Sequence, residues 1–230
     1  MKNQYFGDII DLFKYDLLKA LSEDIQFREI LFIPLLTKND KSNDGKKRNY
    51  QNKVGSKNQK LISFFEEKYS EDKHERKAKV IEEYYKDINI NFRFNPEEIF
   101  IHKNRNEYFS SLISSLKTSS IKNQLLFFDP DNGMQVKRSK DKHILYQELK
   151  NTLNNLCDDS VISVIQFRPR IKWETVLENK KQALIKEVSP FITYIADKNI
   201  AFYLMTKSQK RLKEVESSLE KYKQQYSFLV

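Results

Sequence analysis

Three short runs dominated by apolar residues constrain the fold of this chain more than any other feature. They cover residues 30–36, 124–128 and 160–167. A run of this length that is apolar on both faces is typical of a strand buried within a parallel sheet, which helices cover on both sides. Segments with helical spacing of apolar residues lie between these runs. We therefore expect strands and helices to alternate along the chain.

The rest of the pattern adds a reversal near the end. Residues 192–195 and 200–205 flank a polar turn and predict an antiparallel strand pair, and residues 88–94 could form a short strand. The expected helices cover residues 8–22, 58–69, 73–87, 96–101, 105–117, 143–156, 172–188 and 208–225. Together they predict an α/β fold with a doubly wound, mainly parallel sheet and a terminal antiparallel pair. This Rossmann-like layout is also typical of methyltransferases.

A polar segment interrupts the alternation after the first strand. Residues 37–60 are basic and contain almost no apolar side chains, and several helices are expected before the next long strand. A compact domain usually keeps so long a loop for function or as an insertion. We expect a single domain over residues 1–230, in which residues 37–120 form a polar loop and a mostly helical insertion after the first strand.

Charge and cysteine content narrow the partners and the compartment. The chain has a net charge of +9 and a pI of about 9.3, which favours nucleic acid as a partner. Its single cysteine, Cys157, excludes a disulfide framework and a multi-cysteine zinc site. No apolar run reaches the ~18 residues of a membrane span, and the first residues do not have the pattern of a secretory signal. We predict a cytoplasmic protein without membrane contact, and the sequence predicts nothing about its oligomeric state.

The strongest candidate site is the loop that follows the second buried strand. Its residues are Asp129, Pro130, Asp131, Asn132 and Gly133. In an open parallel sheet, ligands bind at the carboxyl ends of the strands, while the proline and glycine can hold a tight turn. We expect Asp129, Asp131, Asn132 and the nearby Lys137 to carry the chemistry, with Gly133 as part of a cofactor-binding turn. The carboxylates could accept hydrogen bonds from an amino group, act as a general base or bind a cation.

Two other segments predict ligand contacts. Gly7 and Asp8 stand at the start of the first helix, where free backbone N–H groups favour an anion. Thr37, Asp40, Asp44 and Gly45 follow the first strand, at the place where a nucleotide-binding enzyme has its glycine-rich turn. This chain has no G-x-G there, which counts against the usual nucleotide grip.

Basic side chains follow the third buried strand. Arg168 and Arg170 stand directly after it, and Lys142 follows the Asp129 loop. A guanidinium group binds phosphate through its planar fork. We therefore expect these three residues to contact nucleic acid.

The sequence also resembles a family of bacterial proteins of about this length, most of them without an assigned function. The motifs that carry the resemblance are the opening Asn3-Gln4-Tyr5-Phe6-Gly7-Asp8 with Lys14-Tyr15, the residues Thr37 and Asp44-Gly45, the loop Phe127-Phe128-Asp129-Pro130-Asp131-Asn132-Gly133, Gln166 with Pro169-Arg170, and Ala201-Phe202-Tyr203. The chain departs from the family pattern at Gln135, where Glu is common, and at Phe167, where His is common. No catalytic role is assigned to those two positions.

More distantly, the layout is similar to that of adenine-N6 methyltransferases that act on rRNA or DNA. The resemblance implies S-adenosylmethionine as the cofactor, with Gly7, Asp8, Lys14, Thr37, Asp44, Gly45 and Gly133 as the residues nearest to it. It also implies that the Asp129 loop grips the target amino group. The second proline and the tyrosine of the loop in those enzymes are missing here.

Two other functions stay open. Asp129, Asp131 and Lys137 loosely match the two acids and the lysine of a Mg²⁺-dependent nuclease or phosphodiesterase, such as one that acts in defence against phage. In that case Asp129 and Asp131 would hold the metal ion. The third alternative is a non-catalytic adaptor that keeps the fold, favoured by the missing glycine loop.

Overall fold

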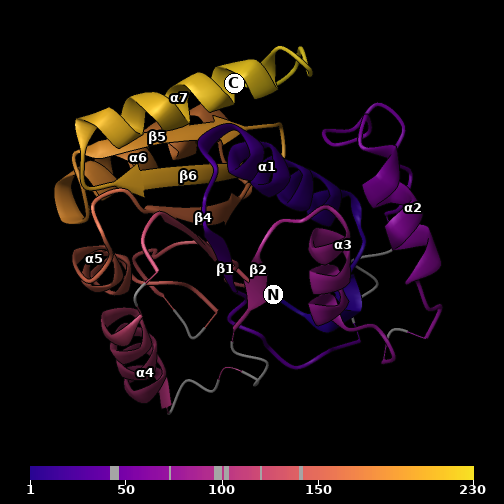
Figure 1. Ribbon diagram of the computed structural model, residues 1–230, viewed down its shortest axis with the longest axis horizontal. Helices are drawn as coiled ribbons and strands as arrows, with labels where there is room; N and C mark the ends of the chain where they lie inside the picture. Colours follow the sequence, from indigo (N-terminus) through magenta and orange to yellow (C-terminus); the bar gives the residue numbers. More distant parts are fainter. Residues whose placement is uncertain (42–46, 73, 96–99, 101–103, 120, 140–141) are drawn as a thin grey trace.

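A six-stranded sheet forms the centre of the molecule (Figure 1). In this computed structural model, residues 1–230 are described apart from 42–46, 73, 96–99, 101–103, 120 and 140–141. The strands are β1 (Glu29–Ile33), β2 (Phe92–Phe94), β3 (Gln124–Phe128), β4 (Val161–Phe167), β5 (Phe191–Ala196) and β6 (Ile200–Thr206). They lie side by side in the order β2-β1-β3-β4-β6-β5.

Strand β6 is the one that reverses direction. Strands β2, β1, β3 and β4 run parallel to one another, whereas β6 is antiparallel to both β4 and β5. The turn between β5 and β6 therefore lies at the same edge of the sheet as the carboxyl ends of β1, β3 and β4. We call this edge the carboxyl edge.

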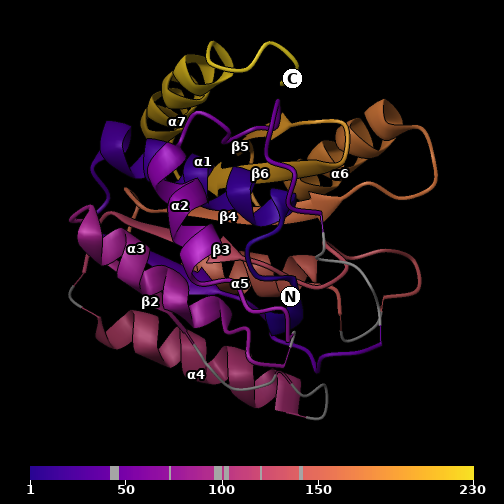
Figure 2. The same ribbon diagram turned by 90° about the vertical axis from the view of Figure 1, so that its right-hand side faces the viewer.

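Helices cover both faces of the sheet, as the doubly apolar strands require. They are α1 (Ile9–Ile25), α2 (Gln59–Glu67), α3 (Ile81–Asp87), α4 (Arg105–Thr118), α5 (Tyr146–Asn154), α6 (Trp173–Glu187) and α7 (Gln209–Lys223), with 3-10 turns at Asn3–Tyr5 and Ala78–Val80. Helices α1, α2, α3 and α7 share one apolar core with the sheet, and α4, α5 and α6 share the other. Figures 1 and 2 show these two layers on either side of the strands.

The predicted fold class is confirmed, with some changes in detail. The buried strands, the terminal antiparallel pair and the helices on both faces are all present. The first strand ends at Ile33 rather than at residue 36, because Pro34 has no backbone N–H and Leu35 takes a positive φ of 41°. Between β1 and β3, the segment expected as an insertion contains α2, α3, α4 and also β2. Part of this segment therefore belongs to the sheet. The expected helix over 96–101 lies mostly outside the described residues.

No helix in the described part of the chain is long and apolar enough to cross a membrane.

A glycine holds the polar segment after β1 against α1. Gly55 has a φ of +86°, and a Cβ atom placed on it would lie 2.8 Å from the backbone oxygen of Leu12. Tyr50 strengthens the same attachment, because its hydroxyl donates a hydrogen bond of 2.5 Å to the backbone oxygen of Gly7. The turn at residues 50–58 is thus fixed next to the beginning of α1, at the carboxyl edge.

We predict that Gly55→Ala lowers the free energy of unfolding by about 1–3 kcal/mol, since a left-handed backbone conformation is strained for any residue with a Cβ and the new methyl group would clash with Leu12. Urea unfolding followed by circular dichroism measures this change. The neighbouring Ser56→Ala serves as the control and should unfold like the wild type. Equal stability of the two variants would contradict the close contact between the turn and α1.

Candidate functional site

A cavity of about 360 Å³ opens at the carboxyl edge, between the start of α1 and the loop after β3. We call it the acidic cavity. Its lining residues come from the first residues of the chain, α1, the loops after β1 and β3, and the last residue of β4. They are Met1, Lys2, Tyr5, Asp8, Ile10, Asp11, Lys14, Asp40, Asp129, Asp131, Asn132, Lys142 and Phe167. The volume falls in the range of about 300–1,000 Å³ that is usual for small-molecule sites.

The centre of the cavity wall is a buried lysine between two aspartates. Lys14 Nζ lies 2.5 Å from Asp11 Oδ1 and 2.7 Å from Asp129 Oδ2. The first pair is local, because residues three apart share a helix face. The second pair joins α1 to the carboxyl end of β3 across 115 positions of sequence. This ion triad therefore fixes Asp129 against α1.

Burial and charge oppose each other within the triad. Burial penalises the charged form of Lys14, but the carboxylates of Asp11 and Asp129 outweigh this penalty and raise its pKa. Burial raises the pKa of Asp11, even though Lys14 and the backbone N–H of Gly7 favour its ionised form. The other oxygen of Asp129, Oδ1, has no hydrogen-bond partner among the residues that the structure describes. Asp129 lines the cavity, and this oxygen can accept a hydrogen bond from a ligand.

Asp8 caps helix α1 and also lines the cavity. Its Oδ1 accepts hydrogen bonds from the backbone N–H groups of Ile10 and Asp11, at 2.8 and 2.9 Å, as an N-cap residue does. Burial and the nearby charge of Asp11 raise the pKa of Asp8 to about 7. A carboxyl group with such a pKa can exchange a proton near neutral pH.

Asp131 is the centre of a second group of charges. Its Oδ2 lies 3.1 Å from Lys2 Nζ and 3.1 Å from Lys142 Nζ, and it accepts a hydrogen bond of 3.2 Å from Thr37 Oγ1. Burial opposes the ionisation of Asp131, but the amino group of Met1 and the two lysines outweigh it and lower its pKa. Asp131 is therefore an ionised anchor for the loop after β1.

The turn that carries these aspartates depends on Gly133. This residue has a φ of +82°, and a Cβ atom on it would lie 2.9 Å from the side-chain oxygen of Gln166. That oxygen accepts a hydrogen bond from the backbone N–H of Met134 at 3.0 Å. Gln166 from β4 therefore clamps the turn that follows β3.

The structure brings most of the predicted site residues together. Asp8, Lys14, Asp129, Asp131, Asn132 and Lys142 line the acidic cavity. Thr37 donates a hydrogen bond to Asp131, and Gly133 lies against Gln166. The backbone oxygen of Gly7 accepts the hydrogen bond from Tyr50.

Other predicted residues lie elsewhere. Lys137 is exposed and does not belong to the cavity lining. Arg168 and Arg170 are exposed on the loop after β4. Asp44 and Gly45 lie outside the described residues.

Sequence reasoning missed several lining residues. Asp11 could have been found, since Asp8, Asp11 and Lys14 are spaced three apart and must share one helix face. Lys2 and Tyr5 have no such local signal, because their places depend on the loop after β1 folding back over the chain start. Asp40 of that loop was predicted as a candidate together with Thr37, Asp44 and Gly45, and it lines the cavity. Lys2 Nζ lies 3.0 Å from Asp40 Oδ2, and Gln4 Nε2 donates to Asp40 Oδ1 at 3.0 Å.

The geometry does not favour a bound metal ion. Within the described ranges, no three His, Cys, Asp or Glu side chains gather in a way that could hold one. Asp129 and Asp131 face different lysines instead. A Mg²⁺ ion would have to displace those lysines.

Comparison with known proteins leaves the function open. No protein-family model matches the sequence, and no curated protein matches it either. Among solved structures, the chain is similar to human methyltransferase-like protein 13 in complex with SAH. The similarity has 13% sequence identity and a TM-score of 0.36, over 90% of this chain and 87% of the human one. At this level the similarity assigns neither an activity nor a ligand to the chain.

We predict that Lys14→Met lowers the free energy of unfolding by about 3–5 kcal/mol, because it leaves two buried carboxylates without their counter-ion. The triple variant Lys14→Met, Asp11→Asn, Asp129→Asn removes all three charges and should recover part of this loss. Urea unfolding of both variants measures the difference. A triple variant that is less stable than the single one would contradict a triad held by charge.

Asp8 also predicts a specific dependence of stability on pH. Its folded-state pKa of about 7 exceeds its unfolded value of 3.8. Between these two values the folded chain keeps a proton that the unfolded chain has released. Stability should therefore fall as pH rises from about 4 to about 7, at about 1.4 kcal/mol for each unit of pKa shift, and stay level above that range.

Asp8→Asn tests this account, since asparagine caps a helix as well as aspartate does but does not titrate. We expect the variant to be more stable than the wild type at pH 8 and to lack the fall that Asp8 causes between pH 4 and 7. Thermal unfolding at a series of pH values measures both effects. The control is Asp72→Asn, because exposed Asp72 also accepts a backbone hydrogen bond, from His74. If the control behaved like Asp8→Asn, the burial of Asp8 would not be the cause.

Proposed function

We propose that this chain is a nucleic-acid-directed transferase of the methyltransferase-like class, which binds S-adenosylmethionine in the acidic cavity and modifies an amino group of a base. The observation that carries the proposal is the acidic cavity at the carboxyl edge, where α/β sheets of this kind bind their ligands. Asp129 lies on its wall directly after β3, with Oδ1 available to a ligand.

The charges of the cavity fit a cationic cofactor. Five carboxylates line it against the side chains of three lysines and the amino group of Met1. S-adenosylmethionine carries a sulfonium and an ammonium group, and both are attracted by an excess of carboxylates. Lys2 and Lys142 would receive the carboxylate end.

The grip on such a cofactor would differ from the usual one. Residues 34–37 are Pro-Leu-Leu-Thr and contain no glycine, so side chains must supply the contacts that backbone N–H groups make in a glycine-rich loop. Tyr5 and Phe167 give the lining two aromatic rings, on which a planar base can stack. When bound, the cofactor supplies a methyl group on a positively charged sulfur.

The chain's own residues would prepare the acceptor amine. Asp129 Oδ1 accepts a hydrogen bond from the amino group and orients its nitrogen toward the cavity. Lys14 holds the Asp129 side chain in position through their ion pair. The nitrogen loses a proton as it gains the methyl group. Asp8 can take up this proton because its pKa is about 7.

The basic charge supports a nucleic acid as the substrate. The chain has a net charge of +9, and exposed Arg168 and Arg170 follow Phe167 directly. Phosphate groups of a strand whose base enters the cavity would pass these side chains. Nuclease action fits less well, because lysines already neutralise the two candidate metal-binding aspartates.

We predict that calorimetry detects binding of both S-adenosylmethionine and S-adenosylhomocysteine to the chain. With a labelled methyl group, transfer to single-stranded RNA or DNA should follow. Asp129→Asn should lower the transfer rate by about 100-fold or more, the usual loss when a group that handles a proton in the reaction is removed. The binding heat should remain, because Asp129 faces the amine rather than the cofactor.

The control for this experiment is again Asp72→Asn, which should bind and transfer like the wild type. Absence of heat with both cofactor forms would refute the cofactor assignment. Binding without transfer by the wild type to either nucleic acid would refute the substrate assignment and favour an adaptor role. A wild-type rate of methyl transfer by Asp129→Asn would refute the catalytic role of Asp129.

A further inference from the structure

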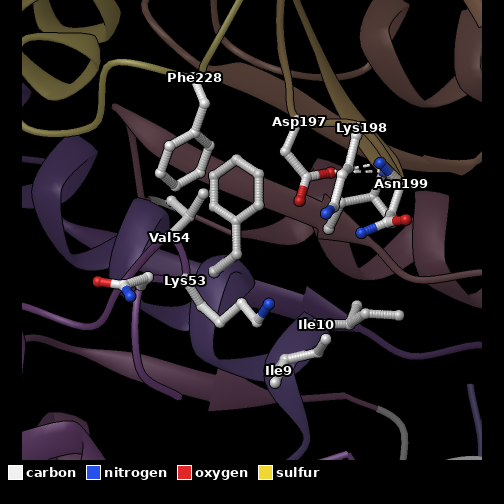
Figure 3. A pocket seen from close by; sticks show the side chains of 11 residues that line it. Ile9, Ile10, Lys53, Val54, Asp197, Lys198, Asn199 and Phe228 are labelled. Atoms are coloured by element: carbon white, nitrogen blue, oxygen red, sulfur yellow. Dashed lines mark hydrogen bonds between the residues drawn. The ribbon is translucent and has the colours of Figure 1, made fainter. Parts of the chain in front are cut away.

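A second pocket, of about 210 Å³, lies at the carboxyl edge beside the turn between β5 and β6 (Figure 3). We call it the hairpin pocket. Its lining residues come from α1, the turn after Tyr50, the β5–β6 turn and the chain end. They are Ile9, Ile10, Phe13, Asn52, Lys53, Val54, Asp197, Lys198, Asn199, Ile200 and Phe228.

The walls of the hairpin pocket are held in place by hydrogen bonds and by close packing. The β5–β6 turn is held by Asp197, whose Oδ1 accepts hydrogen bonds from the backbone N–H groups of Asn199 and Ile200. Trp173 Nε1 donates to the backbone oxygen of Asp197 at 2.7 Å. On the opposite wall, the turn with Lys53 and Val54 packs closely against Leu12, because Gly55 has no side chain. The pocket is therefore preformed, which reduces the ordering cost of binding.

The chemistry of the lining suits a flat ring with phosphate beside it. Ile9, Phe13 and Val54 provide an apolar interior, and Phe228 is 50% exposed at the rim. In Figure 3, Phe228, Val54 and Lys53 lie across the pocket from the turn of Asp197, Lys198 and Asn199. Two lysines and one carboxylate line the pocket, and backbone N–H groups already engage that carboxylate.

The surroundings extend this positive charge. The backbone N–H of Arg168 donates to the Asn199 oxygen at 2.8 Å, and its guanidinium donates to the Lys198 oxygen at 3.1 Å. These bonds tie the basic loop after β4 to the β5–β6 turn. An exposed aromatic ring beside a row of cations is the combination that single-stranded nucleic acid recognises, through base stacking and phosphate contacts.

The hairpin pocket lies beside the acidic cavity. Ile10 lines both. Phe167, which lines the acidic cavity, is also the β4 partner of Ile200, which lines the hairpin pocket. One strand could therefore place bases in both at once. The volume of about 210 Å³ lies below the range of about 300–1,000 Å³ for whole small-molecule ligands and suits a single ring system.

We infer that the hairpin pocket receives an unpaired base of a single-stranded nucleic acid, stacked on Phe228, with Lys53 and Lys198 against its phosphates. The inference rests on the proposed function, because the same strand would present its target base to Asp129. It adds a substrate class to that function: an unpaired strand rather than a duplex, recognised outside the acidic cavity.

Fluorescence anisotropy with labelled single-stranded RNA, single-stranded DNA and duplex DNA, each about 12 nucleotides long to cover one binding site, tests the inference. We expect both single strands to bind more tightly than the duplex, with RNA and DNA compared directly. Phe228→Ala should weaken single-strand binding by about tenfold, within the range for removal of one stacked base, while Phe228→Tyr should keep it. The exposed position of Phe228 leaves the fold intact, and calorimetry with S-adenosylmethionine should be unchanged.

The contribution of Lys53 and Lys198 is measured separately, through the dependence of affinity on salt. Lys53→Ala with Lys198→Ala should reduce the slope of log affinity against log salt concentration by about 0.7 for each phosphate that these lysines neutralise in the wild type. The matched control replaces Lys150 and Lys186, which are exposed on α5 and α6 and line neither pocket. It should keep the wild-type slope, or differ from it by less than the pocket variant.

The outcomes separate this inference from the proposed function. If the Phe228 and lysine variants bind single strands as well as the wild type does, base binding in the hairpin pocket is refuted. Cofactor binding in the acidic cavity is not affected by that result. Equal binding of duplex and single strand would also refute base binding in the hairpin pocket. If Asp129→Asn loses methyl transfer but binds the strand normally, while Phe228→Ala loses affinity for the strand, both the proposed function and the inference about the hairpin pocket are supported. If the wild type binds no single strand, base binding in the hairpin pocket and nucleic acid as the substrate are both refuted. Calorimetry with S-adenosylmethionine then still tests whether the acidic cavity binds the cofactor.

Discussion

The ion triad of Asp11, Lys14 and Asp129 is the interaction on which the rest of the site depends. Each of the three side chains is almost fully buried. A buried charge without a partner is strongly unfavourable, so both aspartates require Lys14, and Lys14 requires a carboxylate beside it. Because Lys14 belongs to α1 and Asp129 follows β3, the triad sets the position of α1 over the carboxyl edge. The acidic cavity is the space that this arrangement leaves.

The reversed strand β6 gives the carboxyl edge its second set of contacts. Since β6 runs against β4 and β5, the turn at 197–199 reaches the edge where the β3 and β4 loops end. A sheet with only parallel strands would carry the crossover connection there instead. The turn packs beside the start of α1 and beside residues 52–54. The acidic cavity and the hairpin pocket thus lie side by side. Five carboxylates with three lysines line the first, and mostly apolar and basic side chains line the second.

Local pattern was enough to predict most of the fold. The runs at 124–128 and 160–167 predicted β3 and β4 closely, because continuous apolar runs between polar loops have few other folded forms. Helix α1 followed from its apolar spacing and from Asp8 as its cap. The end of β1 was missed by three residues because Pro34 lies inside an apolar run that periodicity alone treats as one strand.

The site was harder to predict than the fold. Asp129, Asp131 and Asn132 could be placed at the carboxyl edge because they follow a buried strand. The partners of Asp129 and Asp131 could not, since Lys14 is 115 positions away and Lys2 reaches Asp131 only through the folded chain start. Lys137 was expected beside these aspartates from sequence proximity, yet the turn at Gly133 directs the chain away from the cavity. Charge pairing across the fold leaves little trace in a single sequence.

The central claim is that the acidic cavity holds a cationic cofactor next to Asp129. A crystal structure of the chain soaked with S-adenosylmethionine tests it most directly. The account predicts ligand density bounded by Tyr5, Asp8 and Phe167, with its ring or ammonium group in hydrogen-bonding contact with the cavity carboxylates. Density elsewhere on the chain, or a cavity that holds only water at saturating ligand, would contradict it.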